Sequence, residues 1–289
     1  MKDTKNNNLF IKEHLAQLKD AIYGLAVGDA LGLPAESQQR GSYHLQEMLG
    51  GGIHAQAPGT WSDDTSMTLA TCSSIKNEGT LDARDILRQF RGWLYESRYT
   101  ANGLCFGYGN TTATAIESGT GQASNMDCGN GSLMRIIPLA FLQVSDSEIE
   151  AISAITHAHA IPKQACVIYV RFAQALLAKQ SPAEALSKLD FERPFHRLGR
   201  IACYDKIDIN SGGYVIDTLE AALWCLATTH SYKDCVLAAA NLGDDTDTTA
   251  AVAGGLAGIV YGYQAIPSAW IATLLNKQLI EACLFANSA

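Results

Sequence analysis

Two short acidic clusters constrain this chain more than any other feature. The first acidic cluster covers residues 61–65 (Trp-Ser-Asp-Asp-Thr), and the second covers residues 243–248 (Gly-Asp-Asp-Thr-Asp-Thr). A run of small and apolar residues follows each cluster and predicts a helix, so helix capping explains part of each pattern. One cap needs only one side chain, and neighbouring carboxylates repel each other unless a cation offsets their charge. We therefore expect the clusters to meet at a divalent metal site, where carboxylate and hydroxyl ligands favour magnesium or manganese over zinc.

The composition is that of an ordinary globular chain. Of its 289 residues, 47% are hydrophobic and 17% are charged, which argues against a disordered protein. The net charge is −8 without any run of Lys or Arg, so we expect no obligatory nucleic-acid partner. Residues 1–8 lack the apolar core of a signal peptide, no apolar run is long enough for a bilayer, and the 8 cysteines show no CxxC spacing. These features predict a cytoplasmic protein with reduced cysteines and no membrane partner.

Helical periodicity dominates the sequence. Apolar residues recur at helical spacing from Leu15 to Asp29, and Pro34 is expected to end that helix. Other patterns place helices at residues 80–97, 147–158 and 215–226, N-caps at Ser181 and Ser231, and the start of the last helix at Ile266-Pro267. Alternating strand patterns are scarce. We predict an all-α fold with one domain over residues 11–289, preceded by a polar tail of residues 1–10.

Two sets of glycines recur every four residues and so mark one face of a helix each. They are Gly24, Gly28 and Gly32 in the first set, and Gly254, Gly258 and Gly262 in the second. Glycine inside a helix costs about 1 kcal/mol relative to alanine. Close approach of two backbones is the expected reason for accepting that cost, so we predict tightly packed central helices.

Several single features allow two interpretations. Asp29 lies in the apolar stripe of the first helix, where it either hydrogen-bonds a neighbouring backbone or takes part in the site. Glu36 is either an exposed loop acid or a side chain that reaches into a cleft. The turn of residues 129–135 (Gly-Asn-Gly-Ser-Leu-Met-Arg) is a weak candidate for an anion site, to which Arg135 could add charge. His157 is either a satisfied buried histidine or a functional one. The chain lacks GxSxG, HExxH and Walker A motifs, so nothing supports a serine or cysteine nucleophile.

Five segments, taken in order, resemble the ADP-ribosylglycohydrolase family. They are residues 24–32 (Gly-Leu-Ala-Val-Gly-Asp-Ala-Leu-Gly), the first acidic cluster, the turn of residues 129–135, residues 213–220 (Gly-Tyr-Val-Ile-Asp-Thr-Leu-Glu) and the second acidic cluster. The resemblance implies an all-α orthogonal bundle with two magnesium or manganese ions in a central cleft. By motif match, the metal ligands would be Ser62, Asp63, Asp64, Asp245, Asp247 and Thr248. The catalytic residues would be Glu36, Asp63 and Asp245, and the substrate-binding residues would be Asn130, Gly131, Ser132, His157 and Tyr214.

The activity implied by this resemblance is hydrolysis of the glycosidic bond between ADP-ribose and a protein side chain, with arginine the first candidate. The partners would be an ADP-ribosylated protein and free ADP-ribose, and we expect a monomer. Arginine-directed members commonly carry an Asp before Gly-Asn-Thr-Thr; Gly107 takes that place here, and Asp127 or Glu117 would have to substitute. Another ADP-ribosyl linkage, a small ADP-ribosyl metabolite, a modified nucleic acid and a non-catalytic ADP-ribose binder therefore stay open as alternatives.

Overall fold

The computed structural model describes residues 11–189 and 191–285, and over this part of the chain it is helical, with three isolated β-bridges and no strand. The α-helices are α1 (Leu18–Gly32), α2 (Asp63–Glu78), α3 (Ala83–Glu96), α4 (Asn110–Ser118), α5 (Asp146–Ser153), α6 (Ala160–Leu177), α7 (Pro182–Ser187), α8 (Val215–Thr228), α9 (Tyr232–Ala240), α10 (Thr246–Tyr261), α11 (Ser268–Thr273) and α12 (Lys277–Cys283). The 3-10 helices are η1 (Lys12–Gln17), η2 (Leu33–Ala35), η3 (Asn125–Asp127), η4 (Ile137–Phe141), η5 (His196–Cys203), η6 (Lys206–Asp208) and η7 (Tyr263–Ala265). The predicted all-α fold is confirmed, while the predicted tail of residues 1–10 lies outside the described residues.

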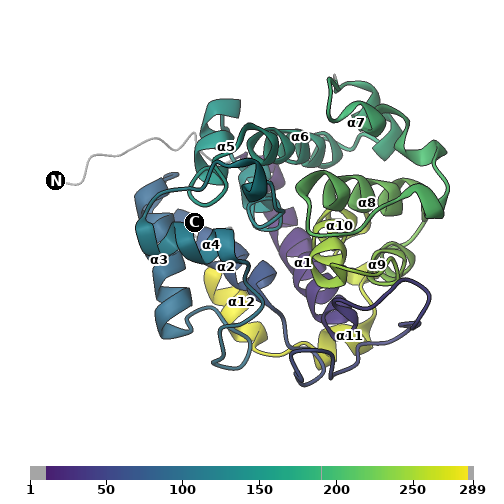
Figure 1. Cartoon of the computed structure of the whole chain (residues 1–289), viewed down its shortest axis with the longest axis horizontal. Helices are drawn as coiled ribbons and strands as arrows, with labels where there is room; N and C mark the ends of the chain where they lie inside the picture. Colours follow the sequence, from purple (N-terminus) through teal and green to yellow (C-terminus); the bar gives the residue numbers. More distant parts are fainter. Residues whose placement is uncertain (1–10, 190, 286–289) are drawn as a thin grey trace.

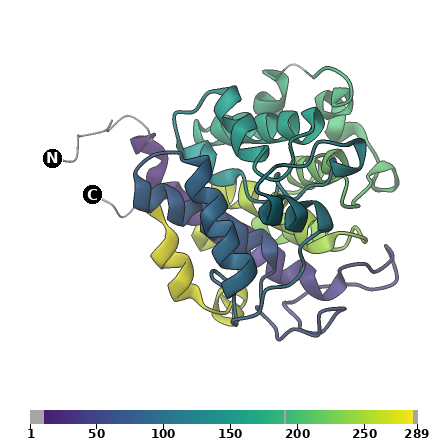
Figure 2. The same ribbon diagram turned by 60° about the vertical axis from the view of Figure 1, so that its left-hand side comes forward.

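Helices α1 and α10 form the centre of the fold and make its most extensive helix–helix contact (Figure 1). Both are buried along nearly their whole length. Helices α8 and α9 cover α10 on one side, while α2 lies against α1 and carries α3 and α12 on the other. The view in Figure 2 shows α2 and α3 at the front of the molecule. The core therefore surrounds one central helix pair.

The glycine spacing explains why this pair comes so close. A methyl group on Gly24 would lie 2.3 Å from the carbonyl oxygen of Gly254, and one on Gly28 would lie 2.1 Å from that of Ala250. One on Gly32 would lie 2.4 Å from the carbonyl oxygen of Thr246. Since a larger residue would meet backbone atoms at each point, the prediction of close backbone approach is confirmed for this stripe.

Gly262 departs from the predicted stripe. It lies beyond the end of α10 with φ of +80°, and no atom lies within 4 Å of the position that a side chain would take. The left-handed backbone region favours glycine, so this residue ends the helix instead of packing against α1.

The central pair is antiparallel, which places the end of α1 beside the start of α10. The Thr246 hydroxyl donates to the carbonyl oxygen of Gly32 over 2.8 Å, directly where α1 passes into η2. Glu36 follows η2, and the second acidic cluster leads into α10. Glu36 and the second cluster therefore meet although more than half of the chain separates them.

Several helix boundaries follow the sequence patterns, and others do not. Ser181 and Ser231 cap α7 and α9 as predicted, and Pro34 lies in η2 directly after α1. The helix predicted over residues 147–158 ends at Ser153, because the following residues turn and Thr156 bonds back to Gln122. The helix after Pro267 is not the last, because α12 follows it. In the described residues, no helix is long and apolar enough to cross a membrane.

Candidate metal and substrate site

Asp29 holds the first acidic cluster in place. Its carboxylate is fully buried and accepts hydrogen bonds from the backbone N–H of Ser62 at 2.9 and 3.0 Å, from the N–H of Thr65 at 3.0 Å and from the hydroxyl of Thr65 at 2.6 Å. These groups belong to the first turn of α2, whose free N–H groups favour a carboxylate. The structure therefore confirms that Asp29 bonds a neighbouring backbone and fixes α2 to α1, which leaves open whether one of its oxygens also faces the site.

The first acidic cluster does more than cap α2. Ser62 is the N-cap, with its side chain 3.4 Å from the N–H of Asp64, and its hydroxyl also donates to Asp64 Oδ2 over 2.9 Å. Asp64 is fully buried, yet its Oδ1 has no hydrogen-bond partner within the described residues. A buried carboxylate oxygen without a partner is unfavourable unless a cation binds it.

The second acidic cluster begins with an unusual turn that pairs with the Glu36 loop. The N–H of Ser37 donates to the carbonyl oxygen of Asp244 over 2.7 Å, and the N–H of Asp244 donates to that of Gln38 over 2.9 Å. Ser37 and Asp244 both have positive φ, at 64° and 58°. Such backbone strain is kept where the surroundings demand it, often near functional sites. The pairing holds Glu36 next to Asp245.

Asp245 is the N-cap of α10 but makes no side-chain cap bond. Its Oδ2 instead accepts from Asn130 Nδ2 over 2.7 Å, and the same nitrogen lies 2.8 Å from the hydroxyl of Thr218. The carboxylate is thus turned away from the helix end toward the cleft. Capping alone therefore does not explain this cluster.

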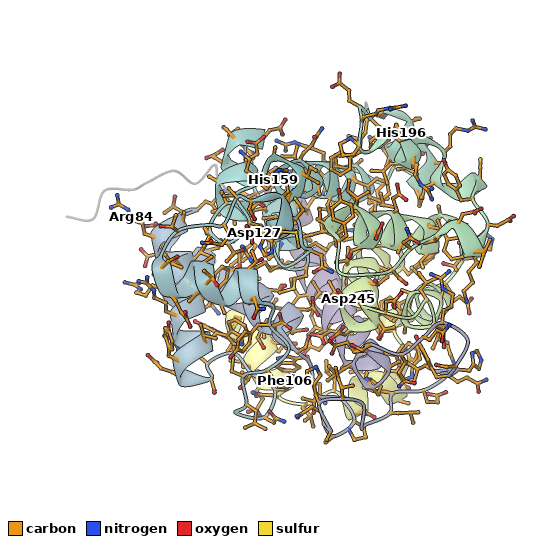
Figure 3. All side chains as sticks on the ribbon, viewed as in Figure 1. Arg84, Phe106, Asp127, His159, His196 and Asp245 are labelled. Atoms are coloured by element: carbon orange, nitrogen blue, oxygen red, sulfur yellow. The ribbon has the colours of Figure 1, made fainter. Side chains whose placement is uncertain are left out.

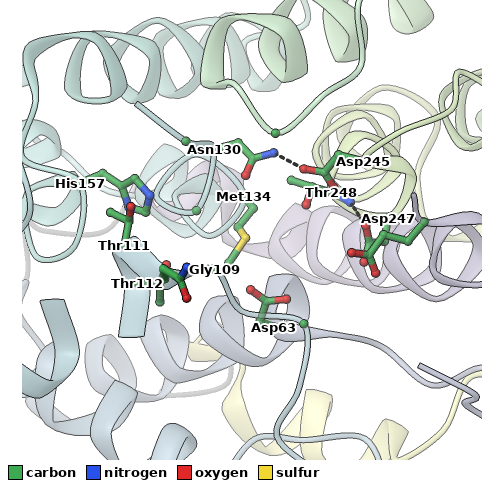
Figure 4. Close-up of a pocket in the computed structure, with 16 residues that line it drawn as sticks. Asp63, Gly109, Thr111, Thr112, Asn130, Met134, His157, Asp245, Asp247 and Thr248 are labelled. Carbon is green, nitrogen blue, oxygen red and sulfur yellow. Dashed lines mark hydrogen bonds between the residues drawn. The ribbon is translucent and has the colours of Figure 1, made fainter. Parts of the chain in front are cut away.

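One cleft of about 290 Å³ collects residues from all the predicted groups (Figure 4). The predicted site residues that line it are Glu36, Asp63, Asn130, Gly131, His157, Asp245, Asp247 and Thr248. Figure 4 shows His157 toward one end of the cleft and Asp245, Thr248 and Asp247 toward the other, with Asn130 bonded to Asp245, and Figure 3 places Asp245 near the middle of the molecule. The predicted metal and substrate residues therefore share one cleft.

Four predicted site residues do not line this cleft. We call the side of the cleft formed by Glu36, Asp63, Asp245 and Asp247 the acidic wall. Ser62 and Asp64 lie buried behind it, and one oxygen of Asp64 lies near carboxylate oxygens of Asp29 and Asp247. Ser132 is fully buried, and its hydroxyl accepts from Ser153 over 2.9 Å. Tyr214 is 40% exposed beside the cleft, and an isolated β-bridge joins it to Gly129.

The carboxylates at and behind the acidic wall lie close together and, within the described residues, form no ion pair with Lys or Arg, an arrangement that suits a hard divalent ion. One carboxylate oxygen each from Asp29, Asp64 and Asp247 lie within 4.8 Å of one another, and all three residues are buried. Burial, and then the charge of neighbouring carboxylates, raises the pKa of Asp63, Asp64 and Asp247 well above the ordinary range. Burial also raises the pKa of Asp29 to about 6. A divalent cation would offset these charges, so the residues present fit the predicted ions.

Glu36 has a partner that the sequence patterns did not identify. Its Oε2 lies 2.7 Å from Nε2 of His54, and both side chains are 21% exposed. Burial raises the pKa of Glu36, while His54 acts in the opposite direction. The His54 ring also contacts that of Phe106, with centroids 5.0 Å apart. Glu36 is therefore a half-buried cleft residue and not the exposed loop acid of the alternative interpretation.

The loop of residues 105–109 disfavours, at position 107, the acid that arginine-directed family members commonly carry. Gly107 has φ of +88°, and a side chain there would begin 2.6 Å from Oδ1 of Asp63. Asp127 and Glu117, the two suggested substitutes, do not line the cleft. Asp127 instead accepts hydrogen bonds from Ser124 and Thr111. Glu36, Asp63, Asp245 and Asp247 are the acids on the cleft wall.

Comparison with known proteins agrees with this geometry. Residues 12–288 match the ADP-ribosylglycohydrolase family. The ADP-ribosylarginine hydrolase Tri1 of Serratia proteamaculans is 34% identical, over 93% of this chain and 78% of the relative. The ADP-ribosyl-[dinitrogen reductase] glycohydrolase of Rhodospirillum rubrum is also 34% identical, over 89% of this chain and 90% of the relative. A solved structure of an ADP-ribosylglycohydrolase-related protein complex superimposes with a TM-score of 0.76 at 30% identity, covering 96% of this chain and 98% of that one. This chain therefore belongs to the ADP-ribosylglycohydrolase family, as its motifs predicted.

Proposed function

We propose that this protein hydrolyses the glycosidic bond between ADP-ribose and an arginine side chain of a modified protein, and releases ADP-ribose. The observation that carries the proposal is the meeting of both acidic clusters, Glu36 and the Asn130 turn in one cleft. The names of the two relatives, both 34% identical, support the substrate class.

The acidic wall would hold two divalent ions, magnesium or manganese. The ligands we assign are Ser62, Asp63, Asp64, Asp245, Asp247 and Thr248, with Asp29 fixing α2 behind them. Such ions, when bound, supply Lewis acidity and lower the pKa of a nearby water. The unpartnered Oδ1 of Asp64 and the raised carboxyl pKa values are the structural support for this assignment.

Glu36 is the residue that we assign to proton transfer. Its Oε2 is engaged by His54, so Oε1 is the oxygen we assign to accept a proton from the attacking water. A second hollow of about 380 Å³ shares Glu36, Gly213 and Asp245 with the cleft. Glu36 therefore lies between the cleft, which we assign to ADP-ribose, and the second hollow, which we assign to the side chain that leaves.

The carboxylates of the cleft wall would also stabilise the transition state. Glycoside cleavage develops positive charge at the anomeric carbon. Asp63 and Asp245 lie on the wall beside Glu36, and their negative charge would be fixed in place before the reaction. This is the role that we assign to them as catalytic residues.

A different ADP-ribosyl linkage is the second candidate, and Gly107 is the observation that favours it. The acid typical of arginine-directed members does not fit there, so a guanidinium would have to pair with Glu36 or Asp63. If neither pairs with it, a serine or aspartate linkage becomes the better substrate. A cytoplasmic location and a monomeric state stay predictions.

The test is release of ADP-ribose from arginine-, serine- and aspartate-linked ADP-ribosyl peptides with Mg²⁺, with Mn²⁺ and with EDTA. We expect metal-dependent release from the arginine peptide. Asp245→Asn should reduce that rate by at least about 100-fold, because it removes a proposed ligand charge. Asp205→Asn makes the same charge change on an exposed side chain that lines neither the cleft nor the second hollow, and it should keep the rate.

The outcomes separate the candidates. Release only from another linkage would replace arginine by that substrate. No release from any peptide, together with tight binding of ADP-ribose, would favour a binding protein or a non-protein substrate. Full activity of Asp245→Asn would refute the assigned metal site.

A further inference from the structure

Arg135 is a fully buried cation without a carboxylate partner. None of the described residues forms an ion pair with it, and burial lowers its pKa to about 10. Its guanidinium lies over the ring of Phe90, 4.6 Å from the centroid, and its contacts to the carbonyl oxygen of Ile152 are long, at 3.4 and 3.5 Å. Its one short hydrogen bond runs from Nη2 to the hydroxyl of Thr156, at 2.7 Å. Thr156 directly precedes His157, which lines the cleft.

The hydroxyl group of Thr156 links Arg135 to His157. The Thr156 hydroxyl oxygen lies 2.8 Å from Nδ1 of His157. Because Arg135 can only donate, the hydroxyl oxygen accepts from it and has its own hydrogen free for Nδ1. A hydrogen on Nδ1 would instead leave the buried hydroxyl hydrogen without an acceptor, which is unfavourable. The chain of bonds therefore sets Nδ1 as an acceptor, and the ring hydrogen sits on Nε2.

The ring of His157 is neutral, and its Nε2–H group faces the cleft. Burial and then the charge of Arg135 lower the pKa of His157 to about 3. Methyl groups placed on Gly129 and Gly131 would lie 3.5 and 3.3 Å from Nε2, so the ring nitrogen faces the glycine turn of the cleft. Within residues 11–189 and 191–285, no group hydrogen-bonds Nε2. The Nε2–H group of His157 is therefore available to donate a hydrogen bond to a ligand.

We propose that Arg135 and Thr156 are positioning residues that hold His157 as an Nε2–H donor to a phosphate oxygen of ADP-ribose. This inference rests on the proposed function for the identity of the ligand. A phosphate oxygen suits the site because the glycine turn lets an anion approach closely and a buried positive charge lies behind the ring. The sequence pattern suggested that Arg135 adds charge to an anion site, and because Arg135 is fully buried, we infer that it acts through Thr156 and His157.

The first test measures the tautomer of His157 in the free protein. Two-bond ¹H–¹⁵N NMR spectra of histidine-labelled protein distinguish the two tautomers, and the signals of His157 are those lost in His157→Gln. We expect the Nε2–H form at neutral pH. In Thr156→Val the Nδ1 signal should move, because that nitrogen loses its donor, and in Thr156→Ser it should stay. An Nδ1–H tautomer or a charged ring in the unaltered protein would overturn the proposal.

The second test measures binding of ADP and of ADP-ribose by calorimetry, with Mg²⁺ present. Both ligands carry the diphosphate, so Thr156→Val should weaken both by about tenfold, while Thr156→Ser should bind as the unaltered protein does. If Thr156→Val binds ADP and ADP-ribose as tightly as the unaltered protein does, the proposed positioning role of Arg135 and Thr156 is refuted. If the unaltered protein binds neither ligand, the proposed function fails, and the ligand part of this inference fails with it. The NMR result still decides whether the hydrogen bonds from Arg135 to Thr156 and from Thr156 to His157 set the tautomer of His157.

Discussion

Gly28→Ala is the sharpest test of how the central helices build the site. The added methyl carbon would lie 2.1 Å from the carbonyl oxygen and 2.6 Å from the carbonyl carbon of Ala250. Both are backbone atoms inside α10, so neither can move unless the helix moves. The substitution therefore changes the spacing of α1 and α10 and not the rotamer of one neighbour.

The magnitude follows from the distances. Ordinary contact begins at 3.4 Å, so the helices must separate locally by about 1.3 Å. Overpacking a tight core costs about 1–3 kcal/mol, and backbone contacts belong to the upper end of that range. Replacing a helical glycine by alanine returns up to about 1 kcal/mol. The net loss should be about 2 kcal/mol, or a fall of about 4–8 °C in the unfolding midpoint for a chain of this size.

Thermal and urea unfolding of Gly28→Ala measure this loss. Gly199→Ala is the control, because Gly199 is an exposed residue of η5 where a methyl group would meet only Cδ2 of Phe191, at 3.6 Å. That variant should be as stable as the unaltered protein or slightly more stable. A Gly28→Ala protein with unchanged stability would refute the claim that backbone contact fixes the helix spacing.

Two further predictions concern protonation. Without metal, the pKa of Asp29 is raised from 3.8 to about 6, so the folded state binds more protons and its stability falls as the pH rises through that window. Mg²⁺ offsets the ionised carboxylates, so the gain in unfolding midpoint between EDTA and Mg²⁺ should grow from about pH 4.5 to about pH 7, and an equal gain at both would contradict the site. His54 lowers the pKa of Glu36, so His54→Phe should move the acid limb of the kcat/KM profile to higher pH. His54→Gln keeps a donor and should move it less; an unmoved limb in both would mean that Glu36 is not the group that titrates.

The helical fold and the acidic residues of the cleft could be predicted because their sequence signals are local and periodic. Glycines four residues apart predicted the backbone contact of α1 and α10. Acidic residues before two helical runs predicted carboxylates at the starts of α2 and α10. Antiparallel packing of the central pair then joins Glu36 to the second acidic cluster. The glycine contact and the meeting of the acidic clusters needed only helical geometry and the poor tolerance of unpaired buried charge, whereas Glu36, Asn130 and His157 were assigned by the family resemblance.

The remaining features depend on where distant loops meet, which periodicity does not encode. His54 and Glu36 come from loops that carry no motif between them, so their 2.7 Å contact had no signal in the sequence. Ser132 belongs to the predicted glycine turn but points into the core. The conflict at Gly107 arises from the position of Asp63, on a different segment. Pairwise contacts of this kind follow from the assembled fold.

The glycines that let α1 and α10 pack closely also set the spacing of the carboxylates in the site. Asp29, Asp64 and Asp247 come from α1, α2 and α10, and their oxygens lie within 4.8 Å only because these helices approach so closely. Metal–ligand distances tolerate changes of about 0.2 Å, far less than the shift that a methyl group at position 28 would force. Gly28→Ala should therefore lose Mg²⁺ affinity by a larger factor than Asp205→Asn, a charge change on an exposed side chain away from the cleft, even at temperatures where it stays folded. Calorimetric titration of both folded variants with Mg²⁺ measures this. Equal affinities would mean that the carboxylates adjust independently of the helix spacing.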